Sequence, residues 1–503
     1  MGNVTRDKRS LVLITVDCLR ADHCGFYGYS RPTTPFLDSL ASESFVVPSA
    51  IVGGAPTYYS FPTILASRMP LALGRDVIGL APGESTIATV LREAGYATGA
   101  FSGANPYISP RFGYEQGFDI FCDFLDFEVH ATQNTVSPEA PLGDSARGKL
   151  NRSIKNVAEA LGLSKLYNEL YFQYRMKNAP AVESIHALRR FPAADVLVDQ
   201  VQSWLASVGQ RPFFLWLHLM DPHSPYYPSD EAFRELTGKS IKPGRARYLN
   251  EYWNRSDLEP SDLRRKRDEV VQLYDAGIRS VDRQISRLVE SLRQMHLWDD
   301  CVLTLTADHG EEFLEHGGRY HAPVRLSEEI VRVPLLIRVP REPGVKVPAS
   351  PMSHLHLAPT LLEIVGAQAP SAFQGRSLWI NLQRGMAWDD PSVGQTIGPA
   401  IIECAYGCTN PIRAESRRAP RLLGVRDARF KLVMRIEPGT TEEMYDLEAD
   451  PAETHPGIDG PGFETRKRLL QAAREHIEKT VSTRDAVMRL RAQLRDLRYE
   501  MFS

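Results

Sequence analysis

Thr304-Leu-Thr-Ala-Asp308-His309-Gly310-Glu311-Glu312 is the stretch that decides the fold, because an apolar strand pattern ends there on a carboxylate and an imidazole. A second short apolar run, Leu11–Val16, also ends on a carboxylate, Asp17. The carboxyl ends of parallel strands meet at one edge of a sheet, so we expect Asp17, Asp308 and His309 to converge on one metal ion. An Asp-His dipeptide alone is more often a hydrogen-bonded loop pair, and its place at a predicted strand end is what favours the metal site.

Short apolar runs alternate with longer helical patterns along most of the chain. In one of these patterns apolar residues recur at steps of three and four, which is typical of a core-facing helix: Ile278, Val281, Ile285, Leu288 and Leu292. The alternation predicts an α/β fold with a mostly parallel sheet sandwiched by helices. The predicted strands are 11–16, 213–219, 301–306 and 333–339, and the predicted helices are 193–207 and 270–295.

The pattern changes near residue 390, so we expect a main domain over 1–390 and a smaller C-terminal α+β subdomain over 391–503. The charged helical tail of the second part favours docking on the body, because its apolar residues keep a 3-4 spacing over only two heptads. Dimerisation is the alternative, and a homo-oligomer is therefore possible. The short strands predicted here are 399–403, 422–426 and 430–435, and the tail residues are Val487, Leu490, Leu494, Leu497 and Met501.

Residues 125–192 interrupt the main domain with a polar stretch followed by the aromatic-rich run 166–174. We interpret this segment as an insertion. It either covers a site or forms a helix that packs its aromatic side chains on the body, since aromatic stripes at helical spacing are usually core.

The composition excludes several classes of protein. The net charge of −3 gives no basic footprint for nucleic acid, and no apolar stretch reaches the roughly 18 residues of a membrane span. Six scattered cysteines favour reduced thiols over a disulfide framework. We therefore expect a soluble, cytoplasmic protein without a membrane span and without a nucleic-acid partner.

A glycine-rich loop, Gly53-Gly-Ala-Pro-Thr57, leads into a predicted helix with Pro62 in its first turn. Thr57 is expected just before that helix, where its hydroxyl could meet both a metal ion and the positive end of the helix dipole. Both influences favour the alkoxide. The alternative is that Thr57 only caps or turns the loop.

Seven motifs are spread over nearly the whole chain. They are Asp17-Cys-Leu-Arg-Ala-Asp-His-Cys-Gly, Thr34-Pro-Phe-Leu-Asp-Ser-Leu-Ala, Tyr274-Asp-Ala-Gly-Ile-Arg-Ser-Val-Asp, Asp308-His-Gly-Glu, Arg332-Val-Pro-Leu-Leu-Ile-Arg, Ala358-Pro-Thr-Leu-Leu and Met444-Tyr-Asp-Leu-Glu-Ala-Asp-Pro. In content and order these motifs resemble the sulfatase family of the alkaline phosphatase superfamily. The resemblance implies an alkaline-phosphatase-like fold, a catalytic domain over 1–390 and metal-dependent cleavage of a small ester substrate.

Several positions depart from the sulfatase pattern. By alignment with that family, Thr57 stands where sulfatases carry the residue converted to formylglycine, and Phe61 takes the place of the motif's arginine. Cys18 stands where many sulfatases have a second metal-binding Asp, and His309 replaces the usual Asn. The threonine resembles that of phosphoethanolamine and lipoteichoic-acid transferases, and the Asp-His pair resembles that of phosphonate monoester hydrolases.

The resemblance also implies roles for other polar residues. His223 and His321 are expected to bind the transferred group or protonate the leaving oxygen. Asn105 falls where sulfatases have a substrate-binding His, although an Asn-Pro turn explains it equally well. His218 is expected either against the substrate or in the core. Thr57 is both the expected nucleophile and a ligand.

Oxygen and nitrogen ligands together favour Zn²⁺ or Mn²⁺ as the single divalent ion, with Ca²⁺ or Mg²⁺ possible. Threonine cannot become formylglycine, and a threonyl sulfate has no easy exit by C–O cleavage. We therefore expect cleavage of a phosphodiester or phosphonate ester through a covalent Thr57 intermediate. The alternatives are a sulfate ester hydrolase, a phosphoryl transferase that uses an acceptor alcohol, and a non-catalytic binding protein.

Overall fold

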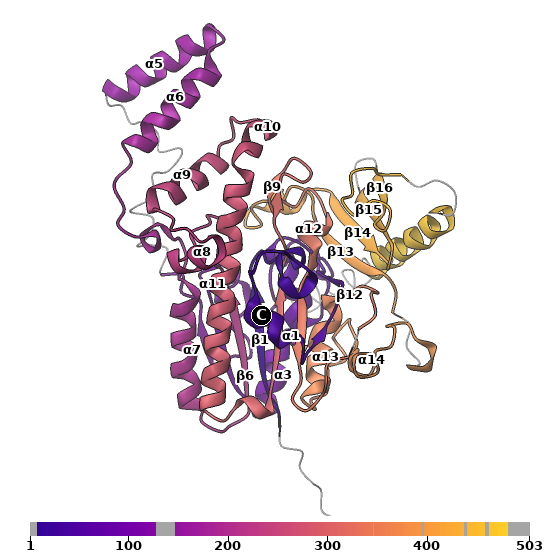
Figure 1. Cartoon of the computed structure of the whole chain (residues 1–503). Coiled ribbons are helices and arrows are strands. Elements are labelled where there is room, and N and C mark those ends of the chain that lie inside the picture. Colours follow the sequence, from indigo (N-terminus) through magenta and orange to yellow (C-terminus); the bar gives the residue numbers. More distant parts are fainter. Residues whose placement is uncertain are drawn as a thin grey trace, which may run out of the picture.

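The computed structural model describes residues 8–126, 146–345, 347–393, 397–436, 440–457 and 462–480. At its centre is a seven-stranded sheet, which Figure 1 shows edge-on between helices. Its strands are β1 (Ser10–Val16), β2 (Phe45–Val46), β4 (Ala97–Ser102), β5 (Ile120–Cys122), β6 (Phe213–Leu219), β7 (Cys301–Ala307) and β11 (Leu335–Arg338). Their order is β2-β11-β7-β1-β6-β4-β5, and only the pairs that involve β11 are antiparallel. The predicted α/β fold with a mostly parallel sheet is confirmed.

The register of the central strands brings the two acidic strand ends together. β1 pairs with β6 and β7 so that Val16 lies beside Leu219 and Ala307. Every residue of these three strands is buried, which explains why they are apolar runs without polar alternation. Asp17 and Asp308 each follow directly on a paired residue, so both carboxylates leave the same edge of the sheet.

Helices cover both faces of the sheet (Figure 1). α7 (Ala194–Val208) and α11 (Arg267–Gln294) lie together on one face, and the five apolar residues of the predicted stripe on α11 are all buried. A second group of helices packs together, namely α2 (Thr57–Ala66), α3 (Ile87–Glu93) and α13 (Leu357–Ile364). The smaller helices are α1 (Pro35–Ala41), α8 (Asp230–Thr237), α9 (Pro243–Trp253), α10 (Pro260–Leu263), α12 (Glu328–Val331), α14 (Trp379–Arg384) and α15 (Ala414–Arg417).

Two short sheets complete the main domain. One joins β3 (Ala50–Ile51) to β10 (Arg332–Val333) and β12 (Met352–Ser353), and the other is the hairpin of β8 (Glu312–Phe313) and β9 (Arg319–Tyr320). The strand predicted at 333–339 is therefore divided between β10 and β11, which belong to different sheets.

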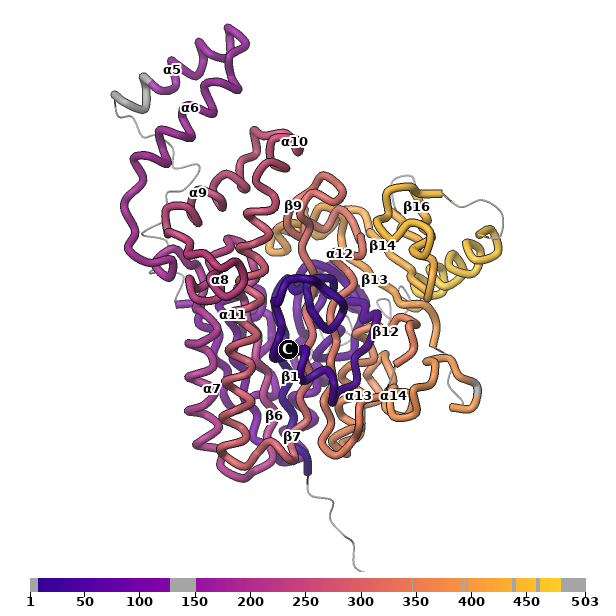
Figure 2. Tube along the Cα trace, viewed as in Figure 1, coloured from indigo at the N-terminus to yellow at the C-terminus, as the bar shows by residue number. Residues whose placement is uncertain are grey.

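The insertion forms a helical hairpin of α5 (Ala146–Ala160) and α6 (Ser164–Lys177), which projects from the body (Figures 1 and 2). Phe172 packs on Tyr248 and Tyr252 of α9, as expected for an aromatic helix docked on the body. Leu166 and Leu170 are 55% and 62% exposed, so most of the hairpin does not pack on the body. Residues 127–145 of the insertion lie outside the described part.

The C-terminal subdomain is built on an antiparallel sheet of β13 (Ala400–Ala405), β14 (Arg421–Arg426), β15 (Phe430–Ile436) and β16 (Thr441–Asp446). A helix over 462–480 packs Leu469 and Ala473 against Leu423 and Leu432 of this sheet. The three strands predicted here and the α+β character are confirmed. The boundary near residue 390 stays a prediction, and the tail with the 3-4 spacing lies outside the described residues.

All six cysteines are free thiols in the structure, as expected. Among the described helices, none combines the length and the apolar character that crossing a membrane requires.

Candidate active site

The carboxyl edge of the central sheet brings three predicted metal ligands together. Asp17 follows β1, and Asp308 and His309 follow β7. One ligand atom from each residue lies within 4.8 Å of the other two, and all three side chains are fully buried. The convergence that the two strand ends predicted is therefore present in the structure.

The two carboxylate oxygens of Asp308 differ in their contacts with the described residues. Its Oδ1 accepts hydrogen bonds from the backbone N–H of His309 at 3.0 Å and of Cys18 at 3.4 Å. Its Oδ2 is buried and makes no hydrogen bond among the described residues, and Nε2 of His309 lies 3.4 Å from it. Burial, and then the charge of Asp17, raise the pKa of Asp308. Two buried carboxylates with an imidazole nitrogen beside them are what a cation would bind, so these residues fit a divalent ion.

Asp17 is held by two neighbouring side chains. Asn105 donates from Nδ2 to Oδ2 of Asp17 at 3.0 Å, and Nε2 of His218 lies 3.3 Å from the same oxygen. Burial alone would raise the pKa of Asp17, but the charge of His223 and the hydrogen bond from His218 keep it well below its usual value. The carboxylate is therefore ionised and oriented.

His309 directs its Nε2 at Thr57. Its Nδ1 lies 2.9 Å from the carbonyl oxygen of Gly310 and can only donate to it. In the neutral imidazole the lone pair is then on Nε2, which lies 3.1 Å from Oγ1 of Thr57. This lone pair can accept the hydroxyl proton of Thr57 or bind a metal ion.

Thr57 is the first residue of α2, not the residue before it as predicted. Pro62 consequently lies inside the helix rather than in its first turn. The position still places the hydroxyl at the positive end of the helix dipole, so the expected electrostatic influence on Thr57 is retained. Phe61, at the family's arginine position, is fully buried with its ring edge-on to His218 at 5.2 Å.

A cavity of about 440 Å³ opens above Thr57, and Asn105, His223 and His321 also line it. The imidazole centroid of His321 lies 4.4 Å from that of His309 and 5.2 Å from that of His223. Nδ1 of His223 donates to the carbonyl of Ser224 at 2.5 Å, so the other nitrogen of this ring is free for substrate. The predicted catalytic residues thus share one cavity.

His218 does not reach that cavity. It is fully buried, and its Nδ1 contacts Oγ1 of Thr15 at 2.9 Å while its Nε2 faces Asp17. The structure places it behind the metal ligands, where it orients Asp17 and has no access to substrate. The substrate-binding role expected for His218 is not supported by this position.

The structure adds three residues to the predicted site, namely Glu311, Tyr226 and Cys18. Oε2 of the buried Glu311 lies 3.0 Å from Nδ1 of His321. The hydroxyl of Tyr226 donates to Oε1 of Glu311 at 2.7 Å. The thiol of Cys18 donates to Oδ1 of Asp17 at 3.0 Å. The position of Glu311 in the same short acidic run as Asp308 could have indicated it from the sequence. No sequence motif around Tyr226 indicates that this residue belongs to the site.

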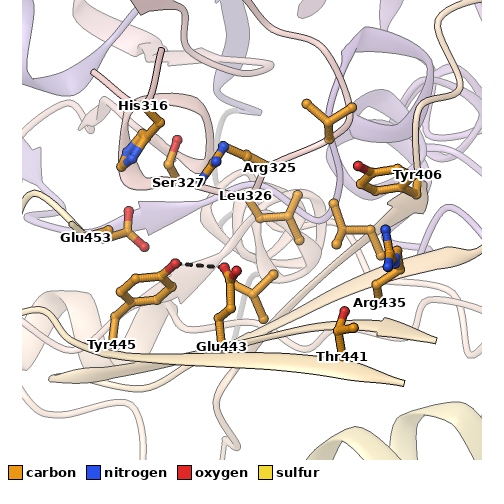
Figure 3. Close-up of a pocket in the computed structure, with 13 residues that line it drawn as sticks. His316, Arg325, Leu326, Ser327, Tyr406, Arg435, Thr441, Glu443, Tyr445 and Glu453 are labelled. Atoms are coloured by element: carbon orange, nitrogen blue, oxygen red, sulfur yellow. Dashed lines mark hydrogen bonds between the residues drawn. The ribbon is translucent and has the colours of Figure 1, made fainter. Parts of the chain in front are cut away.

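A second cavity, of about 450 Å³, lies beside the C-terminal sheet (Figure 3). Arg325, Arg435 and Glu443 line it, but none of the predicted site residues does. At its edge, Nε2 of His316 lies 3.4 Å from a carboxylate oxygen of Glu329, and this contact raises the pKa of His316. His316 and Glu329 therefore form an ion pair. Because no predicted site residue lines the second cavity, the first cavity remains the candidate active site.

The chain is similar to known proteins over most of its length. A family model described as Sulfatase matches residues 9–367. The choline-sulfatase of Rhizobium meliloti (strain 1021) is 26% identical over 286 residues, which cover 53% of this chain and 50% of that protein. The N-acetylgalactosamine-6-O-sulfatase of Bacteroides thetaiotaomicron is 23% identical over 66% of this chain and 68% of that protein. The chain thus spans about half the length of the first curated relatives it matches.

Solved structures share the fold. The phosphonate monoester hydrolase of Agrobacterium radiobacter superimposes with a TM-score of 0.65 at 18% identity, over 95% of this chain and 96% of that one. The phosphonate monoester hydrolase from Silicibacter pomeroyi gives 0.65 at 20% identity over the same shares of the two chains. With the family model covering well over half of the residues, the chain belongs to the sulfatase family.

Proposed function

We propose that this protein is a metal-dependent hydrolase that cleaves a phosphodiester or a phosphonate ester through a covalent Thr57 intermediate. The observation that carries the proposal is the hydroxyl of Thr57, 3.1 Å from Nε2 of His309 at the start of α2 and beside two buried carboxylates. This arrangement supports an activated threonine better than it supports a helix cap.

The residues of the cavity divide the first half-reaction between them. Oγ1 of Thr57 gives up its proton to solvent and attacks phosphorus, and the bond from phosphorus to the leaving oxygen breaks. His223 or His321 gives a proton to that oxygen, and Glu311 keeps the ring of His321 in place. In the second half-reaction the same histidine takes a proton from water as the water oxygen attacks phosphorus. The bond from phosphorus to Oγ1 then breaks, and Oγ1 takes up a proton from solvent, so the threonine and the histidine are both regenerated.

Asp17, Thr57, Asp308 and His309 are the residues that would hold the ion. A bound divalent cation would lower the pKa of the Thr57 hydroxyl and offset charge on the ester oxygens. The chemistry of this donor set favours Zn²⁺ or Mn²⁺ over Ca²⁺ or Mg²⁺, because an imidazole joins the carboxylates.

The identity of the nucleophile favours phosphorus over sulfur. A sulfate ester of threonine lacks the geminal hydroxyl through which formylglycine expels sulfate, and it would have to be attacked slowly at sulfur. A phosphorus ester of threonine remains open to attack by water at phosphorus. The buried Phe61, in place of the family's arginine, also suits an ester of low charge.

The test is a substrate panel with the purified protein. Aryl sulfate, phosphate monoester, phosphodiester and phosphonate monoester are assayed with and without EDTA. We expect EDTA-sensitive turnover of the diester or phosphonate ester well above that of the sulfate. Efficient sulfatase turnover without phosphodiesterase or phosphonate hydrolase activity would overturn the preference and favour sulfate ester hydrolysis, the reaction that the names of the curated relatives describe.

Transfer to an acceptor alcohol is the second candidate, since threonine nucleophiles occur in transferases that resemble this chain. Product analysis with and without an added alcohol separates the two reactions. A hydrolase releases a phosphate monoester from a diester, or the free phosphonate from a phosphonate ester, whereas a new ester of the added alcohol identifies a transferase.

A further inference from the structure

The outer wall of the active-site cavity has an unusual composition. Its lining residues include four aromatic side chains and two guanidinium groups, but no Asp or Glu. The carboxylates of Asp17 and Asp308 are fully buried and do not line the cavity. The aromatic residues are Tyr58, Tyr107, Phe191 and Tyr320, and the guanidinium groups belong to Arg190 and Arg319.

Arg190 is held at this wall by its neighbours. Arg189 is buried and forms an ion pair with Asp221 at 2.6 Å, so the segment is fixed to the loop that carries His223. The ring of Phe191 stands edge-on to that of His223 at 6.2 Å. The backbone of Arg190 therefore has a defined position relative to a catalytic histidine.

Arg190 is exposed and lines the cavity, and it makes no hydrogen bond or direct ion pair within the described residues. Its charge acts on the half-buried carboxyl of Glu251, which does not line the cavity. Arg319 donates from Nη1 to the backbone carbonyls of Trp253 and Arg255, which orient the group without neutralising it. Two positive charges thus face the cavity without a carboxylate partner among its lining residues. Guanidinium groups bind planar carboxylates and phosphates by paired hydrogen bonds.

We infer that Arg190 and Arg319 form a second anion subsite, and that the substrate's leaving group joins an apolar or aromatic portion to a second anionic group. The four aromatic side chains would contact the apolar portion, and the arginines would bind the anion while the ester reacts at Thr57. This inference rests on the proposed function for the reaction, but the binding of the leaving group can be measured without turnover.

The kinetic test compares two aryl phosphonate esters that differ only in a carboxylate on the leaving phenol. Arg190→Gln and Arg319→Gln should each raise KM for the carboxylated ester about 10- to 100-fold, as expected for a lost charged hydrogen bond. kcat, and both constants for the neutral ester, should change less than about twofold. Arg190→Lys keeps the positive charge but cannot form the paired hydrogen bonds of a guanidinium group. It should therefore raise KM for the carboxylated ester less than Arg190→Gln does.

Arg92→Gln is the matched control, because Arg92 is an exposed arginine on α3 that pairs with Asp119 and does not line the cavity. Equal losses for the two esters in the Arg190 or Arg319 variants, or no loss, would overturn the subsite. Unchanged melting temperatures must accompany the result, since Arg319 also contacts backbone.

Calorimetry with 4-hydroxybenzoate and phenol separates this inference from the proposed reaction. The wild type should bind 4-hydroxybenzoate at least about tenfold more tightly than phenol, and Arg190→Gln should remove the difference. If no ester is turned over, the proposed function fails and this binding result still decides the subsite. Equal binding of the two phenols by the wild type would refute it.

Discussion

Glu311 positions His321 through a buried contact of 3.0 Å, and it is the most specific single residue that the structure adds to the site. Glu311→Gln keeps the shape but removes the charge that orients the imidazole. We expect kcat to fall about 10- to 100-fold with little change in KM, the size of effect seen when supporting hydrogen bonds are lost at metal sites. Steady-state kinetics on the best substrate of the panel measures this.

Tyr226→Phe is the control for that variant. It removes the other hydrogen bond to Glu311 and leaves the contact with His321 intact. A smaller loss than in Glu311→Gln is expected. If the two variants behave alike, or if Glu311→Gln retains full kcat, Glu311 does not act through His321.

The buried His354 should make the unfolding free energy of the protein depend on pH. It is fully buried, its Nε2 contacts Oγ1 of Thr306 at 2.9 Å, and burial lowers its pKa from 6.5 to about 3. The unfolded chain therefore binds this proton first as pH falls. The stability is complete above about pH 6.5 and declines from there towards pH 3.

Between pH 7 and pH 5 this histidine should account for about 2 kcal/mol of lost unfolding free energy. Urea unfolding of the wild type and of His354→Gln at both pH values measures the difference in slope. Equal pH dependence of the two proteins would show that the histidine is not kept neutral by burial.

Sequence alone predicted the residues that follow buried strands, namely Asp17, Asp308 and His309. The reason is that strand ends have a fixed geometry, which the register of β1 and β7 reproduces. His218 could not be assigned in this way. Alternation along β6 puts it on one face of a strand, but only the structure shows that this face lies behind Asp17 and not against the cavity.

The contact between α11 and the loop after β6 fixes the place of His223. A Cβ atom on Gly277, in the middle of α11, would lie 2.7 Å from the carbonyl oxygen of Asp221. Since that atom is backbone, Gly277→Ala must displace the helix or the loop. We expect a loss of about 1–3 kcal/mol in unfolding free energy and a lower kcat, because His223 follows two residues later.

Gly244→Ala is the matched control for this prediction. Gly244 is also helical, in α9, and a Cβ there would meet no atom within 4 Å. The substitution should be neutral or stabilise the protein by up to about 1 kcal/mol, since alanine favours helix. Denaturant unfolding and kinetics on both variants give the comparison, and equal behaviour would contradict the proposed contact.

Elements with a clear period were predicted with small boundary errors, such as 193–207 for Ala194–Val208 and 270–295 for Arg267–Gln294. The hairpin of β8 and β9 was not predicted, because two-residue strands carry no period. That hairpin is what brings His321 back to His309, and the sequence showed only the twelve-residue spacing between them.

The C-terminal subdomain is joined to the main domain by a buried ammonium group. Lys431 of β15 is fully buried and contacts the carboxylates of Glu453 and, at 3.2 Å, of Glu328. Lys431→Met would leave these buried acids without their partner. We expect a loss of about 3–5 kcal/mol in unfolding free energy, as for other broken buried pairs.

Arg429→Met is the control at the whole-molecule scale. Arg429 lies next to the same strand but is half exposed in its pairs with Asp446 and Glu448, so its loss should lower the unfolding free energy far less than the loss of Lys431. Thermal and urea unfolding of both variants test the prediction. A cost for Lys431→Met no larger than for Arg429→Met would show that the buried cluster does not stabilise the junction.

The layered architecture of the whole molecule followed from the sequence, because alternating strands and helices leave few ways to cover a parallel sheet. The form of the insertion over 125–192 did not follow from the sequence. It was predicted either to cover a site or to pack an aromatic helix on the body. In the structure Phe172 of α6 packs on α9, and residues 190–191 line the cavity. Tertiary contacts decide such a segment, not its period.

The central claim is that Thr57 carries the transferred group during turnover. Protein mixed with a phosphonate ester or phosphodiester, quenched in acid and digested, should yield the Thr57 peptide with the added mass of the phosphoryl or phosphonyl group. Thr57→Ala should show neither adduct nor turnover. Turnover by the wild type with no adduct on this peptide, together with retained activity in Thr57→Ala, would contradict the account.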